Sequence, residues 1–272
     1  MPELPEVETI ARDLDPRLTG TRILGVRITH PDVIAGPSER FTRAVTGIHI
    51  VGVGRRGKNV VIRLEDDGRL VVNLGMTGRL VTSDAPRAGE LGHIAVRLLL
   101  DDGRDLLYDD TRRFGLLAHY DPAGWRWREA ELGLEPLGDA FTGETLGALL
   151  KKTRTPVRNF LLDQRKVAGV GNIYALEALF LAGIRPTRRG RRVTYREAAR
   201  LRDALRDVLR RAIRNRGTTF SDYRDGSGET GGFAPLLNVY GREGRPCPRC
   251  GTAIKRKVLT NRSAFYCPAC QT

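Results

Sequence analysis

No stretch of this 272-residue sequence is apolar for long enough to cross a membrane. A membrane-spanning helix needs about 20 apolar residues in a row, whereas runs such as residues 98–100 and 180–182 are far shorter. The N-terminus, Met-Pro-Glu-Leu-Pro-Glu, also lacks the basic and then apolar regions of a signal peptide. These absences predict no membrane partner and a location in the cytosol or nucleoid of a bacterium.

Negative charge is scarce as well. Asp and Glu number 32 against 46 Lys and Arg, which leaves a formal charge of +14. This excess is larger than solubility requires and favours a polyanionic partner such as nucleic acid. Charge alone leaves open a merely solvated basic surface, so the motifs must decide between the two.

Cysteine occurs only near the C-terminus, as Cys247, Cys250, Cys267 and Cys270. Two Cys-x-x-Cys pairs at this separation are typical of a four-thiolate zinc ribbon. Two disulfides would require an oxidising compartment, which the N-terminus argues against. Because four thiolates close a tetrahedral site, we predict one structural Zn²⁺ with no open position for a catalytic water. Basic residues surround the pairs, and Arg262 falls at the tip of a predicted hairpin.

The first half of the chain has the pattern of β-structure. Runs rich in β-branched residues flank Gly-containing turns, which is a hairpin signal, and several such runs predict a sandwich or barrel. The expected strands are residues 22–28, 48–53, 60–64, 69–74, 95–100 and 104–108. A helix with Pro5 in its first turn precedes them, because Val7, Ile10 and Leu14 fall at helical spacing.

Gly and Pro between residues 132 and 142 mark a boundary, after which the apolar periodicity becomes helical. The expected helices are residues 143–150, 157–162, 172–182 and 194–214. Thr194 and Glu197 form a capping box at the start of the last one. Residues 216–233 are rich in Gly, Thr, Ser and Asp, and loops of this length are usually functional or disordered. The whole pattern predicts an α+β protein.

The N-terminal proline is a candidate nucleophile. Removal of Met1 exposes the secondary amine of Pro2, and such α-amino groups have a pKa of about 7.7–8.0 in peptides. A neutral secondary amine that attacks a sugar C1′ gives an iminium directly, which splits one difficult displacement into easier steps. Glu3 is placed to move protons during ring opening and elimination. Glu6 either supports this chemistry or caps the first helix.

These residues open a series of motifs that resembles the formamidopyrimidine-DNA glycosylases of the endonuclease VIII superfamily. The likeness begins with Pro-Glu-Leu-Pro-Glu-Val-Glu-Thr at residues 2–9 and extends to Gln271. It continues at residues 55–58, 74–78, 110–115, 169–175 and 240–244 and ends with the cysteine ribbon. Several independent motifs stand in the family's order.

The resemblance implies three domains and a DNA-repair activity. Residues 1–132 would form a catalytic β-sandwich, 133–235 a helix-two-turns-helix domain and 236–272 a zinc finger. The activity would be that of a bifunctional DNA glycosylase and AP lyase, which excises oxidised purines through a Schiff base and cleaves the strand by β,δ-elimination. Damaged double-stranded DNA would be the partner of a monomeric enzyme.

The resemblance also assigns residue roles. It makes Pro2 the nucleophile, Glu3 the acid and base, and Lys58 a phosphate contact near the lesion. Asn172 and Arg262 would pinch the DNA backbone beside the extruded nucleotide. The void left in the duplex would be filled by Met76, Arg112 and Phe114. Inserted apolar side chains hold DNA kinked, although Met and Phe are otherwise common core residues.

Four positions depart from the family pattern. Asn73 stands in place of a histidine, Arg158 of a lysine, Thr111 of a proline and Asn261 of a glycine. Asn73 and Arg158 keep donors for phosphate, but Arg158 cannot act as a neutral amine. The segment 218–232 resembles the family's lid over the extruded base.

Two other hypotheses fit the same sequence. One is an endonuclease VIII-like glycosylase for oxidised pyrimidines, with the same chemistry. The other is a non-catalytic zinc-ribbon DNA-binding protein. The purine interpretation is favoured by Met76, Arg112 and Phe114 together with Leu4 in the opening motif.

Overall fold

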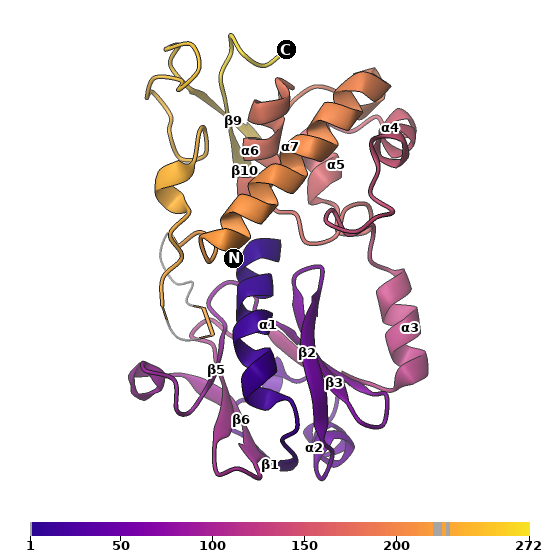
Figure 1. Cartoon of the computed structure of the whole chain (residues 1–272), viewed down its shortest axis with the longest axis vertical. Coiled ribbons are helices and arrows are strands. Elements are labelled where there is room, and N and C mark those ends of the chain that lie inside the picture. The colour runs from indigo at the N-terminus through magenta and orange to yellow at the C-terminus, as the bar shows by residue number, and fades with distance from the viewer. Residues whose placement is uncertain (1, 220–224, 227–228) are drawn as a thin grey trace. The chain divides into compact units, whose positions relative to one another are not determined.

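The structure is a computed structural model that describes residues 2–219, 225–226 and 229–272. The chain forms two compact units, each described here by itself (Figure 1). Unit 1 comprises Met1–Glu131 and Ile213–Ala234, and unit 2 comprises Leu132–Ala212 and Pro235–Thr272. Among the described residues, no helix is both long and apolar enough to span a bilayer.

Unit 1 contains two four-stranded antiparallel sheets. The first has the strand order β1-β6-β7-β5 and the second the order β2-β3-β4-β8. Their bounds are β1 Ile23–Ile28, β2 Ile50–Arg56, β3 Asn59–Leu64, β4 Arg69–Asn73, β5 Arg79–Thr82, β6 Ile94–Leu100, β7 Asp105–Asp109 and β8 Leu116–Tyr120. This is the predicted β-sandwich, and both predicted hairpins, β3-β4 and β6-β7, are confirmed.

Helix α1, Leu4–Leu18, packs against strands of both sheets (Figure 1). Its apolar face, with Val7, Ile10 and Leu14, is completely or almost completely buried in the core that the two sheets share. Each such side chain contributes about 1.5–3 kcal/mol of burial. Because the helix is held along its length, its N-terminal turn, which carries the candidate nucleophile, has a fixed position in unit 1.

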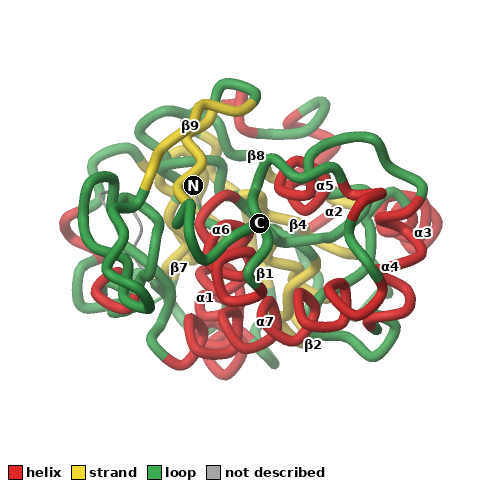
Figure 2. Tube along the Cα trace, turned by 90° about the horizontal axis from the view of Figure 1, so that it is seen from above, coloured by secondary structure: helices red, strands yellow, loops and turns green. Residues whose placement is uncertain are grey.

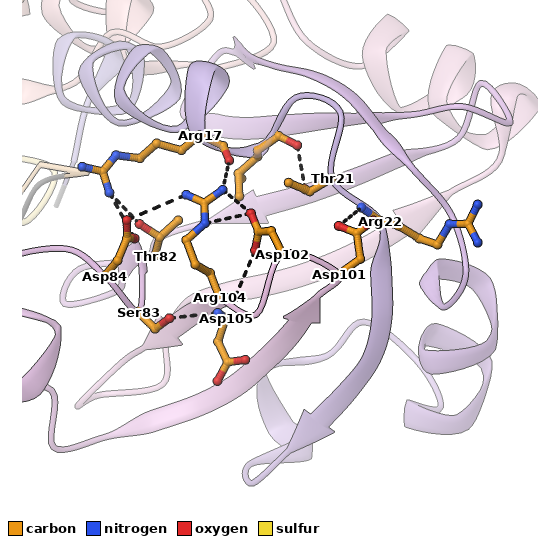
Figure 3. A network of polar contacts seen from close by, with 11 residues as sticks. Arg17, Thr21, Arg22, Thr82, Ser83, Asp84, Asp101, Asp102, Arg104 and Asp105 are labelled. Atoms are coloured by element: carbon orange, nitrogen blue, oxygen red, sulfur yellow. Dashed lines mark hydrogen bonds and ion pairs between the residues drawn. The ribbon is translucent and has the colours of Figure 1, made fainter.

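The C-terminal end of α1 is held by a polar network (Figure 3). Arg104, in the turn between β6 and β7, donates to the carbonyl oxygen of Arg17 and to Asp102. Arg17 in turn donates to Asp84 (3.2 Å) and to Thr82 (2.9 Å) at the end of β5. A cation at a helix C-terminus satisfies free carbonyls and complements the helix dipole.

Unit 2 is mostly helical. Its helices are α4 Gly143–Lys151, α5 Val157–Leu162, α6 Asn172–Ala182 and residues 195–212 of α7, which runs as Tyr195–Arg214. The predicted capping box is confirmed, since Glu197 N–H donates to Thr194 and Thr194 N–H donates to Glu197. The apolar stripe of α7 is buried, as expected.

Two turns connect α5 to α6, and the Gln164 side chain organises them. Its amide accepts from Gly169 N–H (2.8 Å) and donates to the carbonyl oxygens of Leu162 and Val170. Gly169 has a φ of +84°, a backbone conformation that favours glycine. The motif therefore delivers Asn172 to the first position of α6, as the sequence indicated.

The cysteine-rich C-terminus carries the hairpin β9 Lys255–Leu259 and β10 Arg262–Tyr266 (Figure 2). Thr260 and Asn261 form its turn with φ of +46° and +59°. Two positive φ angles are the geometry of a type I′ hairpin turn, which asparagine tolerates without glycine. Arg262 follows directly, so the prediction of an arginine at the hairpin tip is confirmed.

Several elements were not apparent in the sequence. These are strands β5 and β8 and helices α2 Ser38–Val45 and α3 Pro122–Ala130. Helix α2 is amphipathic but short, with Phe41 and Val45 as its buried residues, and α3 has no buried residue and so produces no strong apolar period. Single-turn 3-10 helices occur at Pro31–Val33, Ala88–Glu90, Gly190–Arg192 and Ala234–Leu236.

Candidate functional site

The candidate nucleophile and acid lie at the first turn of α1. Pro2 is buried, and Glu3, with 4% of its surface exposed, is the residue that caps the helix. Glu3 N–H donates to Glu6 Oε2 (2.8 Å), and the Glu3 side chain accepts from the Glu6 backbone N–H in a capping box. This arrangement places a carboxylate beside Pro2 at the positive end of the helix dipole. Met1 lies outside the described residues.

Glu6 contacts a second segment of unit 1 as well. With 2% of its surface exposed, it accepts from Thr218 N–H through Oε1 (2.7 Å). A Cβ at Gly217, which has a φ of +83°, would lie 2.8 Å from the same oxygen. The Glu6 carboxylate therefore has two roles. It caps α1, as the sequence allowed, and it also connects α1 to the start of residues 218–232.

A second tie joins α1 to this segment through charged groups. Arg216 donates to Asp13 on α1 and to Asp225, and Gly226 N–H also donates to Asp13. Burial raises the pKa of Asp13 above its usual range, although Arg216 opposes that shift. The sequence predicts a lid at residues 218–232. Of these, residues 220–224 and 227–228 lie outside the described residues.

Lys58 and Asn73 lie on the sheet next to α1. Lys58 is in the turn between β2 and β3, and that turn is fastened by Arg55, which donates to Gly57 O (2.9 Å) and to Glu8 of α1 (3.0 Å). Asn73 donates to Asn59 on β3 and accepts from Gly75 N–H. Where the family has a histidine, this asparagine therefore shapes the turn after β4. Its contact with DNA stays a prediction.

The three side chains expected to fill the duplex void lie on two exposed loops of unit 1. Met76 is 41% exposed and Phe114 is 59% exposed, so neither belongs to the core. The guanidinium of Arg112 lies 4.7 Å from the centre of the Phe114 ring, which is a cation–π distance. Met and Phe are usually buried in protein cores, so their exposure on neighbouring loops is notable. Exposed apolar side chains of this size suit insertion into a base stack.

Unit 2 brings Asn172 and the hairpin tip together. Asn172 Nδ2 donates to Ser263 O (2.9 Å), next to Arg262, and its Oδ1 accepts two hydrogen bonds from Arg158. Arg158 also donates to Leu259 O (3.1 Å) at the end of β9. Within unit 2, Asn172 is thus hydrogen-bonded to the residue that follows Arg262, the other residue expected to pinch the DNA backbone.

Arg158 itself is buried in unit 2. Only 1% of its surface is exposed, and its guanidinium donates to protein oxygens on α5, α6 and the hairpin. Burial lowers its pKa, and the nearby charge of Arg262 lowers it further. The planar guanidinium thereby orients Asn172 and the hairpin. The phosphate contact expected of Arg158 stays a prediction.

The four cysteines form one cluster that fits a metal ion. Their sulfur atoms lie within 4.8 Å of one another, with distances of 3.4 Å for Cys250 to Cys270 and 3.9 Å for Cys247 to Cys270. Thiolates about 2.3 Å from a tetrahedral Zn²⁺ are separated by about 3.8 Å, so the cluster fits zinc. Cys247 and Cys267 pack with Leu176 and Phe180 of α6, which fastens the ribbon to the helices.

Two carboxylates at the site were missed by the sequence reasoning. Asp110, 1% exposed, joins the loops of Met76 and Phe114, and its position inside the motif 110–115 was its only sequence signal. Glu177 on α6, also 1% exposed, accepts the backbone N–H groups of Asn238, Val239 and Tyr240. An acidic residue in an apolar helix is the signal that could have identified it.

The chain matches three family profiles in succession. Residues 1–117 match the formamidopyrimidine-DNA glycosylase N-terminal domain, residues 132–224 the formamidopyrimidine-DNA glycosylase H2TH domain, and residues 244–272 the zinc finger found in FPG and IleRS. The chain belongs to the formamidopyrimidine-DNA glycosylase family. The order of the matches agrees with the series of motifs in the sequence.

Individual relatives are similar over the whole length. Formamidopyrimidine-DNA glycosylase of Chloroflexus aggregans is 44% identical over 100% of this chain and 98% of its own, and that of Thermomicrobium roseum is 46% identical over 100% and 99%. The crystal structure of the MutM (Fpg) protein from Thermus thermophilus superposes with a TM-score of 0.88 at 42% identity, covering 99% of this chain and 98% of that one. A complex of Lactococcus lactis Fpg with DNA containing an abasic site has a TM-score of 0.89 at 33% identity, covering 99% of both chains.

Proposed function

We propose that this protein excises oxidised purines, such as 8-oxoguanine and formamidopyrimidines, from double-stranded DNA and then cleaves the strand as an AP lyase. Membership of the glycosylase family supports a base excision repair enzyme. The observation that carries the proposal is the buried Pro2–Glu3 pair, which Glu6 fixes at the first turn of α1. Four cysteines that are grouped for a metal and form no disulfide suit a reducing location, the cytosol or nucleoid.

The chemistry starts at the Pro2 nitrogen. The amine forms a bond to C1′ of the damaged nucleotide as the bond from C1′ to the base breaks, and Glu3 supplies and receives the protons of sugar-ring opening. The resulting iminium acidifies C2′–H, whose loss breaks the C3′–O bond and releases the 3′-phosphate. The conjugated iminium that forms then loses the C4′ proton, and the C5′–O bond breaks with release of the 5′-phosphate. Glu3 has little exposure to water, which favours proton transfer within the site.

The remaining residues hold the DNA. Lys58 binds a phosphate near the lesion, while Asn172 and Arg262 bind the backbone beside the extruded nucleotide. Met76, Arg112 and Phe114 occupy the space that the nucleotide leaves, which offsets an unstacking cost of a few kcal/mol. One Zn²⁺ on the four cysteines is structural and keeps the Arg262 hairpin folded.

Borohydride trapping tests the nucleophile. The native protein, mixed with a duplex that contains 8-oxoguanine opposite cytosine and reduced with borohydride, is expected to give a covalent complex. Peptide mass mapping is expected to place the adduct on the peptide that begins at Pro2. An adduct on Lys58 or another lysine would overturn the assignment.

A matched control changes only the amine. A protein with two extra residues ahead of Pro2 keeps every side chain but converts the secondary amine into an amide, and it is expected to bind lesion DNA without trapping. Intact mass of the native protein reports whether Met1 has been removed. Efficient trapping by the extended protein would contradict the proposal.

A further inference from the structure

The loops that carry Met76 and Phe114 meet at a single buried carboxylate, Asp110. Oδ1 accepts from the Thr77 hydroxyl (2.5 Å) and from Arg112 N–H (3.2 Å). Oδ2 accepts from the Tyr108 hydroxyl (2.9 Å) and from Gly115 N–H (2.9 Å). We call these residues the Asp110 cluster: Thr77, Tyr108, Asp110, Arg112 and Gly115. The cluster lies entirely in unit 1.

Three of the four donors to Asp110 belong to or adjoin a residue expected in the DNA void, and the fourth is the Tyr108 hydroxyl on β7. Thr77 follows Met76, Gly115 follows Phe114, and Arg112 donates its own backbone N–H. Thr77 Oγ1 also accepts from Arg112 N–H (3.1 Å), so the two loops are bonded to each other as well as to Asp110.

The loop backbones are packed too closely for extra side chains. A Cβ at Gly75, whose φ is +57°, would lie 2.6 Å from Gly115 N, and a Cβ at Gly115 would lie 1.7 Å from the Tyr108 hydroxyl. Residues 74–78 and 110–115 are therefore in close backbone contact as well as hydrogen-bonded. The two joined loops expose Met76 and Phe114 while their own polar groups remain satisfied.

We infer that Asp110 is a positioning residue that joins the two loops into one preformed wedge, so that Met76, Arg112 and Phe114 enter the duplex together. This inference rests on the proposed function of those three side chains. Insertion of a preformed wedge avoids the entropy cost of ordering two separate loops on DNA. Burial alone would raise the pKa of Asp110, but the bonds from Thr77, Gly115 and Tyr108 outweigh it and hold the pKa below its ordinary value, so the carboxylate stays an acceptor for all four donors.

Asp110→Asn tests the inference with almost no change in volume. The new amide group must face either the Thr77 and Arg112 donors or the Tyr108 and Gly115 donors, so one pair loses its acceptor. Single-turnover excision from a lesion duplex is expected to fall by about tenfold to a hundredfold, as for misplacement of a positioned group by about 1 Å. Cleavage of a single-stranded abasic oligonucleotide, which has no void to fill, is expected to change by less than about twofold.

Asp109→Asn is the matched control. Asp109 is equally buried, at 2% exposed, and adjacent, but it accepts from His93 N–H (2.6 Å) rather than from either loop. Hydrogen exchange of the free proteins is expected to speed up at the Arg112 and Gly115 amides in Asp110→Asn and to stay native there in Asp109→Asn. Thr77→Val, which removes the bridging hydroxyl, is expected to act in the same direction with a smaller effect.

The outcomes separate this inference from the proposed function. If the double variant Met76→Ala with Phe114→Ala excises duplex lesions at the native rate, void filling fails and the inference fails with it. If that double variant is slow while Asp110→Asn is native, only the inference is overturned. Equal losses by Asp110→Asn on duplex and single-stranded substrates would also overturn it, because they indicate a general folding defect.

Discussion

At the scale of single residues, buried carboxylates organise the functional parts of this protein. Glu6, Asp110 and Glu177 are each 1–2% exposed, and each accepts at least two hydrogen bonds from the backbone. A buried charge is costly unless it is fully hydrogen-bonded, so these groups persist only where several donors converge. In each case the donors come from a loop that carries, or adjoins, a proposed DNA contact or the zinc ribbon.

Arg112 is predicted to read the base left opposite the extruded lesion. A guanidinium has only donors, whereas the pairing edge of cytosine offers two acceptors and that of adenine offers one acceptor beside a donor. Arg112→Ala is therefore expected to reduce the preference for cytosine over adenine by about tenfold to a hundredfold, which corresponds to about 1–3 kcal/mol. Single-turnover excision opposite each base measures this ratio.

Arg113→Ala is the control for that experiment. Arg113 lies next in the same loop but contacts His30 (3.3 Å) and Asp32 (3.5 Å) instead of the Phe114 ring. Its loss removes the same charge and is expected to leave the preference unchanged. If Arg112→Ala slows excision equally opposite both bases, Arg112 serves only to neutralise phosphate.

At the scale of elements, α1 is held at both ends by polar contacts and along its length by the core. The Glu3 and Glu6 capping box fixes the start, and Arg104 fixes the end (Figure 3). The proposed nucleophile, Pro2, lies just before the start of α1. A rigid helix therefore holds the Pro2 amine in a well-defined position.

The network at the end of α1 predicts a dependence of stability on pH. Hydrogen bonds from Arg104 lower the pKa of Asp102, and a hydrogen bond from Thr82, with the charges of Arg17 and Arg104, lowers that of Asp84. Because the folded-state pKa values lie below the unfolded value of about 3.9, both groups contribute stability above that pH and lose it as the pH falls through their folded values.

Arg104→Gln is therefore expected to lower the free energy of unfolding by about 0.5–1 kcal/mol at pH 6 and by less below about pH 4. The expected loss of stability is small because Asp84 is 48% exposed and water screens the ion pairs. Urea unfolding at several pH values measures the difference. Arg43→Gln, an exposed cation of α2, controls for net charge; a difference for Arg104→Gln that stays constant down to pH 2.5 would contradict the prediction.

At the scale of the whole molecule, the two compact units have separate cores and separate duties. Unit 1 holds Pro2, Glu3, Lys58 and the wedge, and unit 2 holds Asn172, Arg262 and the zinc ribbon. The ribbon packs on α6 through its own cysteines, so a metal on these cysteines would support the hairpin of unit 2.

Loss of zinc is accordingly predicted to abolish lesion binding while unit 1 stays folded. Cys267→Ser removes a buried ligand, and metal affinity supplies much of the folding free energy of a small ribbon. Trp125 and Trp127 lie on α3 of unit 1. Because Trp127 is 67% exposed, the reporter of unit 1 unfolding is Trp125, which is partly buried with its ring centre 6.3 Å from that of Tyr120. A native fluorescence transition is expected together with loss of gel-shift binding to lesion DNA. Undiminished binding by a protein verified to be zinc-free would contradict the prediction.

Features that depend on local spacing could be predicted from the sequence. The zinc site follows from two Cys-x-x-Cys pairs, the hairpins from alternation around Gly-containing turns, and the capping box of α7 from Thr194 and Glu197. Each is formed by residues near one another in the chain, so their chemistry is visible without knowing the fold.

Contacts between groups that are far apart in the chain could not be predicted, because they depend on how the elements pack. Asp110 accepts from Thr77 across 33 positions, Arg158 from α5 reaches Leu259 across 101, and Glu6 reaches Thr218 across 212. Alternation in a strand indicates which face is buried but not which donor faces it, because that depends on how sheets and helices pack. For the same reason the sequence assigned Arg158 to DNA, whereas packing buries its guanidinium against Asn172 and the hairpin.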